Sequence, residues 1–286
     1  MLSHSRLLIL FPLFLGPAAQ ADDTSTPVAQ PQQLAVSATQ TPLPTMGAKP
    51  RQAAPKLVEP QLRIARSGDG KHLRVALTFD ACMGKTDDRI LSVLVAERIP
   101  ATIFVTARWL RTNPQALATL KQNADLFQIE NHGQNHVPAI DIPASVYGIA
   151  AAGSSDAVRQ EVTGGADAIK AAGITPPAWF RGSTAKYDAS AIRQIRAMGY
   201  RIAGYSLNGD GGSLLGAAAT EKKIAAAKDG DVVIAHINQP THAAGEGVAR
   251  ALLSLKKRGV EFVRLQDTDE TGDHETTKEI AGSIGQ

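Results

Sequence analysis

Two histidines are separated by three residues in the segment His132-Gly-Gln-Asn-His136. Both imidazoles can reach one ion if the segment is helical, because residues four apart share a helix face, and the spacing also serves in a loop. Two of only seven histidines occur here directly after an apolar run, which favours a metal site over two unrelated loop histidines. Imidazole is a borderline ligand, so the pattern predicts a divalent ion, zinc first, with cobalt, nickel or iron also suitable.

Four more side chains with useful chemistry follow apolar, β-branched runs: Asp80, Arg181, Asp210 and His236. A catalytic ion needs a third protein ligand and an open position for water, and Asp80 is one candidate for that ligand. Asp80 and His236 are also the available general base and general acid. Arg181 could pair with Asp80 or Asp210 and keep that carboxylate ionised. Each residue alone also fits a structural role, as a turn former, a packed histidine or a surface ion pair. Together with the histidine pair they favour a site.

The elements that would position these residues are short strands alternating with amphipathic helices. Helical spacing of apolar residues is clear at Ile90, Leu91, Leu94 and Val95. The alternation predicts an α/β fold whose parallel sheet closes, or nearly closes, into a barrel, and the strand ends would then converge on one mouth. An open doubly wound sheet is the alternative, although no GxGxxG follows the first strand. The expected strands are residues Arg74–Phe79, Ala101–Val105, Phe127–Glu130, Ala178–Phe180, Ile202–Tyr205, Val232–Ala235 and Glu261–Val263.

Five segments between Arg74 and Leu265 resemble, in order, the motifs of the polysaccharide deacetylase family, carbohydrate esterase family 4. The segments are Thr78-Phe79-Asp80-Ala81, Asn131 to His136, Phe180-Arg181-Gly182, Ser206 to Asp210 and Val233 to His236. The resemblance implies one catalytic domain, a distorted (β/α)7-type barrel, that hydrolyses N-acetyl or sometimes O-acetyl groups and releases acetate. It implies metal ligands at His132 and His136, a general base at Asp80, a general acid at His236, and Arg181 tuning Asp80.

The first motif departs from the family, because Thr-Phe-Asp-Ala-Cys replaces Thr-Phe-Asp-Asp. The second aspartate of the family, its usual third metal ligand, is Ala81 here, and a methyl group cannot bind a metal. Asp80 could ligate the ion itself, or Asp87 or Asp88 on the following turn could reach back. The thiolate of Cys82, the only cysteine, is a further candidate that would favour a softer ion. These changes predict a divergent branch of the family.

The N-terminus has the pattern of a secretory signal over residues 1–21. Arg6 precedes the apolar run Leu7 to Leu15, and Ala19-Gln20-Ala21 fits the small-x-small cleavage rule. We expect export to the periplasm or the cell exterior, with an uncleaved membrane anchor as the alternative. Residues 22–60 are rich in Pro, Gln, Thr and Ala and predict a disordered tether. Residues 61–266 are the expected catalytic domain, and residues 267–286 a flexible tail.

The expected function is therefore a metal-dependent hydrolase that removes N-acetyl groups from an amino-sugar polysaccharide or cell-wall glycan. One alternative is a carbohydrate- or envelope-binding protein that kept the barrel and lost catalysis. This alternative is suggested by Ala81, which replaces the usual third metal ligand. Another is hydrolysis of a non-sugar amide, which export disfavours. The formal net charge is only +3 and no basic run occurs, so we expect no nucleic-acid partner. No other apolar run is long enough to span a bilayer. The sequence does not determine the oligomeric state.

Overall fold

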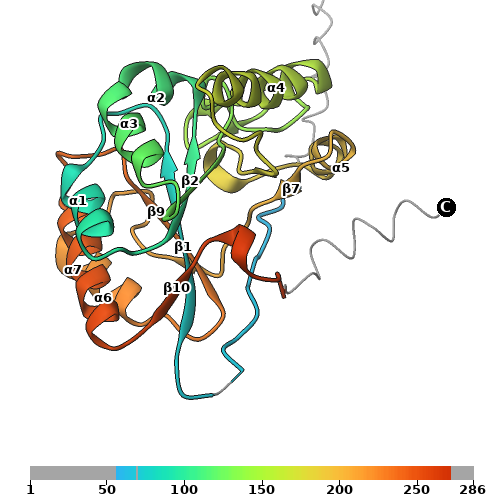
Figure 1. Ribbon diagram of the computed structural model, residues 1–286. Helices are drawn as coiled ribbons and strands as arrows, with labels where there is room; N and C mark the ends of the chain where they lie inside the picture. Colours follow the sequence, from blue (N-terminus) through green and yellow to red (C-terminus); the bar gives the residue numbers. More distant parts are fainter. Residues whose placement is uncertain (1–55, 69, 272–286) are drawn as a thin grey trace, which may run out of the picture. The chain divides into compact units, whose positions relative to one another are not determined.

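The computed structural model describes residues 56–68 and 70–271, which form a curled parallel sheet surrounded by helices (Figure 1). Strand order in the sheet is β7-β6-β3-β2-β1-β9-β8, and β10 pairs with the beginning of β1. The predicted α/β fold, a distorted (β/α)7-type barrel in a single domain, is thereby confirmed. The strands are β1 (Arg74–Ala81), β2 (Ala101–Val105), β3 (Phe127–Asn131), β6 (Trp179–Phe180), β7 (Arg201–Ile202), β8 (Leu207–Asn208), β9 (Asp231–His236) and β10 (Glu261–Val263).

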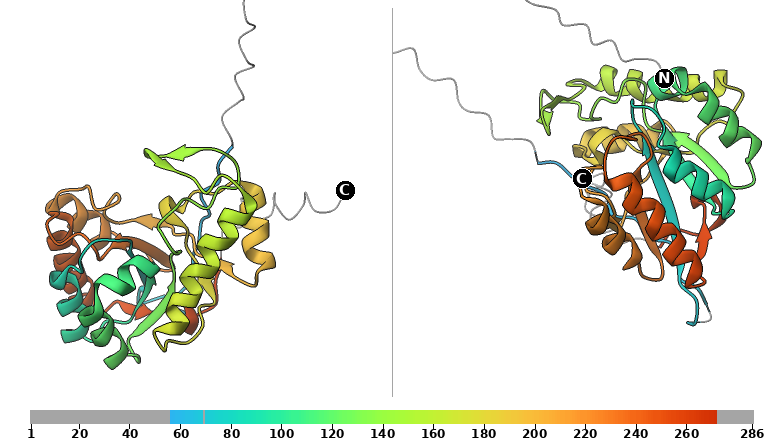
Figure 2. Two further views of the ribbon diagram at one scale, coloured as in Figure 1. Left: turned by 90° about the horizontal axis from the view of Figure 1, so that it is seen from above. Right: turned by 90° about the vertical axis from the view of Figure 1, so that its left-hand side faces the viewer.

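The helices cover the outside of the curled sheet. Helices α1, α6 and α7 pack together along one side, whereas α4 and α5 lie on another (Figure 1). A small antiparallel hairpin of β4 (Ser145–Val146) and β5 (Ile149–Ala150) stands out from the body (Figure 2). The helices are α1 (Asp88–Ala96), α2 (Ala107–Thr112), α3 (Pro114–Gln122), α4 (Ser155–Ala171), α5 (Ala189–Ala197), α6 (Ala217–Ala225) and α7 (Ala244–Lys257). Among the helices in the described ranges, none has both the length and the hydropathy needed to cross a membrane.

Strand β1 is central to the site because its two faces have different chemistry. Phe79 and Ala81 belong to the main apolar cluster, together with residues of α1 and α7. Side chains alternate along a strand, so Thr78, Asp80 and Cys82 face the other way. The Thr78 hydroxyl donates to the carbonyl oxygen of Val233 on β9 at 2.6 Å. The strand therefore directs Thr78 and Asp80 toward the barrel interior, whereas Phe79 and Ala81 face the helices.

The predicted strand over Ile202–Tyr205 does not form as expected. Strand β7 ends at Ile202, and β8 begins only at Leu207. The intervening carbonyl groups of Ala203 and Gly204 instead accept hydrogen bonds from Arg181 Nε at 3.1 Å and Nη2 at 3.0 Å. Hydropathy alone could not predict this interruption, because the two carbonyl groups bind the buried guanidinium of Arg181, the residue that follows β6.

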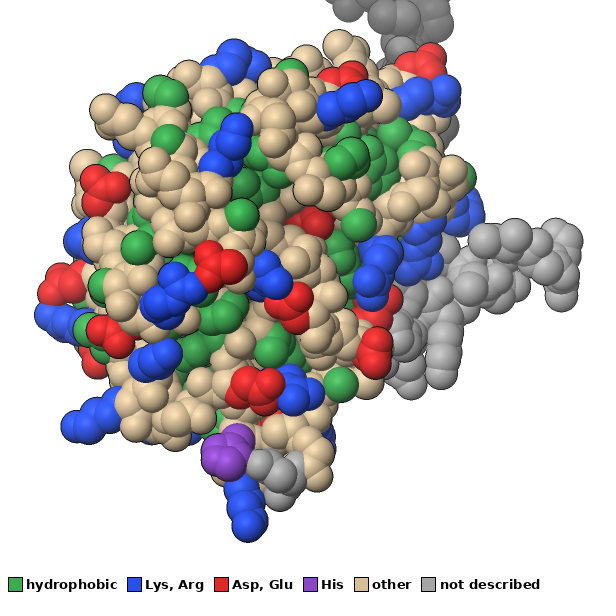
Figure 3. All heavy atoms as spheres, in the orientation of Figure 1, with side chains coloured by type: hydrophobic (Ala, Val, Ile, Leu, Met, Phe, Trp, Pro, Cys, Tyr) green, Lys and Arg blue, Asp and Glu red, His purple; other side chains and the backbone are tan. Residues whose placement is uncertain are grey.

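Both ends of the packed domain extend beyond the predicted boundaries of 61 and 266. Val58 forms an antiparallel bridge with Tyr187, and Ala65 N–H donates to the Asp269 carbonyl at 2.8 Å. Thr271 N–H donates to the Arg63 carbonyl at 2.9 Å. The expected signal segment, most of the expected tether and the tail after residue 271 lie outside the described residues. On the face shown in Figure 3, basic and acidic side chains are interspersed.

Candidate metal-dependent active site

Cys82, His132 and His136 form a cluster whose potential ligand atoms all lie within 4.8 Å of one another. Cys82 Sγ lies 3.5 Å from His132 Nε2, and the two imidazole ring centroids are 5.1 Å apart. Burial, followed by the negative charges of Asp80 and Asp210, raises the pKa of the Cys82 thiol. A bound cation would offset both effects and favour the thiolate. One thiolate and two imidazoles are a donor set that fits a divalent ion of the zinc type.

His132 is held in the orientation that a metal ligand needs. Its Nδ1–H donates to the carbonyl oxygen of Arg181 at 2.6 Å, which leaves Nε2 as the nitrogen with a free lone pair. Nε2 is the atom that faces Cys82 Sγ, and it also lies 3.7 Å from Asp80 Oδ2. Burial lowers the pKa of His132 and so favours the neutral, metal-binding form.

His136 lies in a loop, not on a helix, so the loop version of the expected spacing is the one found. Its backbone adopts a positive φ of 63°. The loop is shaped by Glu161 of α4, whose carboxylate accepts hydrogen bonds from Asn135 N–H at 2.9 and 3.0 Å and from Val137 N–H at 3.1 Å. Gly133, with φ of 92°, is required there because a Cβ atom would lie 2.4 Å from Glu161 Oε1. Burial lowers the pKa of His136 to about 3.

Glu161 is a positioning residue that the sequence analysis missed. The signal was present, because Glu161 lies on the face of α4 that also carries the buried residues Val158, Val162 and Ile169. A carboxylate on an apolar helix face needs hydrogen-bond donors from elsewhere in the chain. The loop that holds the histidines supplies them.

Asp80 forms a buried ion pair with Arg181, with 2.9 Å between Asp80 Oδ1 and Arg181 Nη1. The sequence left Asp80 and Asp210 as possible partners of Arg181, and the structure pairs Arg181 with Asp80. The guanidinium is fully buried, and it also stacks 4.3 Å from the centroid of the Phe104 ring. Burial raises the pKa of Asp80, but the charge and the hydrogen bond of Arg181, with positive charge on the nearby imidazoles when they are protonated, outweigh it, so the pKa lies below its ordinary value. Asp80 is therefore ionised at neutral pH.

The other expected carboxylate, Asp210, pairs with His236. Both Asp210 oxygens lie 3.1 Å from His236 Nδ1, and Oδ2 also accepts the backbone N–H of His236 at 2.6 Å. Burial lowers the pKa of His236, but the hydrogen bond and charge of Asp210 outweigh it and raise the pKa above the ordinary value. His236 is also the partner of Asp80 in the register between β9 and β1. A carboxylate whose pKa is lowered and an imidazole whose pKa is raised thus lie on neighbouring strands.

Two candidates for the third metal ligand, Asp87 and Asp88, are not members of the cluster. Asp87 is buried at the start of α1, where its carboxylate forms hydrogen bonds with Arg89 at 2.8 and 2.6 Å. Asp88 is exposed on the first turn of α1. Neither belongs to the cluster of potential ligands in the described chain, whereas Cys82 does. Asp80 lies beside that cluster without being one of its three members.

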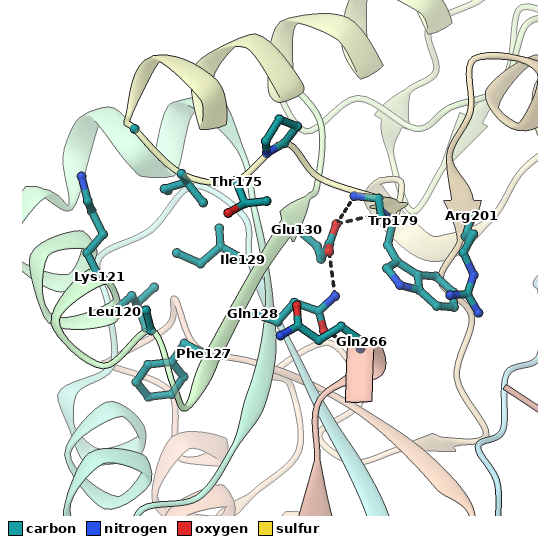
Figure 4. A pocket seen from close by; sticks show the side chains of 15 residues that line it. Leu120, Lys121, Phe127, Gln128, Ile129, Glu130, Thr175, Trp179, Arg201 and Gln266 are labelled. Atoms are coloured by element: carbon teal, nitrogen blue, oxygen red, sulfur yellow. Dashed lines mark hydrogen bonds between the residues drawn. The ribbon is translucent and has the colours of Figure 1, made fainter. Parts of the chain in front are cut away.

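A separate cavity of about 520 Å³ lies between α3, β3 and the segment before β6, and Figure 4 shows its lining. Glu130 projects into it and accepts hydrogen bonds from the backbone N–H groups of Ala178 and Trp179 at 2.9 and 2.8 Å. Burial raises the pKa of Glu130 to about 7. None of the cluster residues lines this cavity, so the metal candidate and the cavity are distinct features.

Residues 67–203 match the family model for polysaccharide deacetylases. This segment is therefore similar to polysaccharide deacetylase domains. The match includes Asp80, both histidines of the cluster and Arg181, and it ends before Asp210 and His236. A search of curated proteins found no match.

Solved structures share the fold of this domain. A peptidoglycan N-acetylglucosamine deacetylase is 17% identical with a TM-score of 0.58, over 73% of this chain and 92% of that one. A family 4 carbohydrate esterase from Streptomyces lividans, in complex with acetate, is 18% identical with a TM-score of 0.53, over 69% and 93%. A pseudoenzyme of the same family from Bacillus anthracis is 19% identical with a TM-score of 0.54, over 68% of this chain and 65% of that one. At these identities the likeness shows the fold alone.

Proposed function

We propose that this protein is an exported, metal-dependent hydrolase that removes N-acetyl groups from an amino-sugar polysaccharide, such as a cell-wall glycan. The observation that carries the proposal is the meeting of three kinds of group at one end of the sheet. These are the Cys-His-His donor set, the Asp80–Arg181 ion pair and the His236–Asp210 pair. The polysaccharide substrate is inferred from the family, one of whose solved members is a peptidoglycan N-acetylglucosamine deacetylase.

The two pairs divide the acid and base work of amide hydrolysis. A bound divalent ion would supply a Lewis acid that polarises the acyl carbonyl and lowers the pKa of water. Asp80, held ionised by Arg181, accepts the proton of the attacking water. His236, whose pKa is raised by Asp210, donates a proton to the departing amine. Neighbouring titratable groups whose environments push their pKa values in opposite directions are typical of such an assignment.

A second candidate is a glycan-binding protein without catalysis. It is favoured by Ala81, which removes the usual carboxylate ligand, and by the existence of a pseudoenzyme with this fold. A binding protein, however, would not need a buried ion pair at Asp80 or a charged partner for His236. A third possibility, hydrolysis of a non-sugar amide, is distinguished from the main proposal by comparing turnover on sugar and non-sugar amides.

The proposal is tested by measuring bound metal and acetate release in wild type and His132→Ala. The substrates are acetylated amino-sugar oligomers, peptidoglycan and simple non-sugar amides. We expect His132→Ala to lose both metal and turnover. The matched control is His242→Ala, because the His242 imidazole bonds the Ser213 carbonyl and lies outside the cluster. Turnover unchanged in His132→Ala would contradict the proposal, and a metal-replete protein that binds glycan without releasing acetate would favour the binding role. N-terminal sequencing of the secreted form tests export, with a start near Asp22 expected.

A further inference from the structure

We propose that the Cys82 thiolate is the third protein ligand of the ion, and that Asp80 is thereby left free to act as the base. The inference deepens the proposed function, since it concerns the same ion. It can nevertheless be tested by metal binding alone.

The direction of β1 explains why residue 82, and not residue 81, supplies the ligand. Ala81 is fully buried in the apolar cluster that contains Phe79 and residues of α1 and α7. A carboxylate at position 81 would face this cluster. Cys82 lies two residues beyond Asp80 and therefore shares its face of the strand. The side chain that reaches the histidines is thus displaced by one position from the family motif.

The distance between two of the donor atoms matches that expected around a coordinated ion. Ligand bonds of about 2.3 Å to sulfur and about 2.0–2.1 Å to nitrogen, at tetrahedral angles, place the two donors about 3.6 Å apart. The distance from Cys82 Sγ to His132 Nε2 is 3.5 Å. His136 completes a group of three, which leaves a fourth position for water or substrate.

The surroundings hold both donors in place. The Thr106 hydroxyl donates to the carbonyl oxygen of Cys82, and the same hydroxyl accepts the Trp109 N–H at 2.9 Å as the cap of α2. His132 is fixed through its Nδ1 bond to the Arg181 carbonyl. Because Arg181 also pairs with Asp80, one residue orients a ligand and the base together.

The exchange of carboxylate for thiolate changes which ions the site prefers. Both ligands carry one negative charge, so the charge on the bound ion is still balanced. A thiolate is softer, and it favours zinc and cobalt(II) over magnesium, calcium and manganese. A thiolate ligand is compatible with catalysis, because catalytic zinc sites with cysteine and histidine ligands and an open position exist.

The test is a cobalt(II) titration of the full chain, followed by optical absorption. A thiolate ligand produces a sulfur-to-cobalt charge-transfer band in the near ultraviolet, which carboxylate and imidazole ligands do not produce. The chain has one cysteine, so the band can come only from Cys82. We expect one equivalent of cobalt with this band in wild type. Cys82→Ser and Cys82→Ala should lack the band and bind zinc at least about 100-fold more weakly, since even loss of a residue that only supports a ligand costs about 10–100-fold.

Two further variants keep the result interpretable. Cys82→Asp should bind cobalt without the band, and His242→Ala should retain both binding and band. A wild-type complex with one cobalt and no charge-transfer band would overturn the proposal, as would unchanged zinc affinity in Cys82→Ser; the 3.5 Å contact would then be an ordinary S–H···N hydrogen bond. A band in a protein that never releases acetate would support the ligand and contradict the hydrolase. Acetate release from a cobalt complex without the band would support the hydrolase and contradict the thiolate ligand.

Discussion

Replacing Asp210 by Asn should lower the pKa of His236 without reshaping the site. The amide oxygen can still accept from Nδ1–H and from the backbone N–H of His236, so the losses are the charge and the hydrogen bond from Gly212 N–H to the other oxygen. Asp210 is 1% exposed and His236 is 19% exposed, so solvent screens the pair weakly. A hydrogen bond to a charged group contributes about 1.5–3 kcal/mol, and one pKa unit corresponds to about 1.4 kcal/mol. The pKa of His236 is therefore expected to fall by about 1–2 units.

The assay is an NMR titration of the His236 ring in wild type and Asp210→Asn, followed by the pH profile of acetate release. In wild type the folded pKa of His236 lies above its ordinary value of 6.5. The stabilisation from the pair is therefore fully present below the unfolded pKa and is lost as pH rises through the folded pKa. In the variant this loss, and the alkaline limb of the activity profile, should move to lower pH. Asp229→Asn is the control, because Asp229 bonds backbone groups of Ser67 and Arg74. A His236 pKa that is the same in wild type and Asp210→Asn would refute the reasoning.

Three further perturbations test the surroundings of the site. Arg181→Met leaves the buried Asp80 carboxylate unpaired and should lower the free energy of unfolding by about 3–5 kcal/mol in denaturant titrations. Glu130, with its pKa raised from 4.5 to about 7, binds more protons in the folded state between those values, so stability should fall as pH rises through that window. Glu130→Gln should remove that pH dependence, a difference of up to about 3 kcal/mol across the window. Gly165→Ala places a Cβ atom 2.2 Å from Asn131 Oδ1 and should cost about 1–3 kcal/mol and weaken zinc binding, measured by unfolding and by metal titration.

Each perturbation has a matched control in the same chain. Arg250→Met breaks only exposed ion pairs and should change stability by less than about 1 kcal/mol. Glu261→Gln alters an exposed glutamate and should leave the pH dependence intact. Gly216→Ala adds a methyl group in open space. Equal effects in a test variant and its control would contradict the corresponding prediction.

The fold and most of the site were predictable because their signals are local. The alternation of strands and helices determines the α/β class, and Asp80 and His236 each lie at the end of an apolar run. Cys82 was one of several candidate third ligands, and its type alone did not single it out, because a thiolate is typical of a softer site. Which residue faces the barrel depends on the pleat of β1 and on the packing of Phe79 and Ala81 against the helices.

Longer-range contacts account for the remaining differences. Glu161 holds the histidine loop from a helix that begins 19 residues after His136, a distance that no short motif spans. The interruption between β7 and β8 depends on a guanidinium that starts on another strand. Neither contact can be recognised without the tertiary structure. Both contacts position the site residues and do not change which residues form the site.

The pairing of residues 63–65 with residues 269–271 has a consequence for engineering. The first and last packed segments lie side by side, joined by backbone hydrogen bonds. A short linker could therefore connect them, and new termini could be opened in the β4–β5 hairpin, which pairs only with itself (Figure 2). Such a circular permutant would retain every strand that carries a ligand, base or acid.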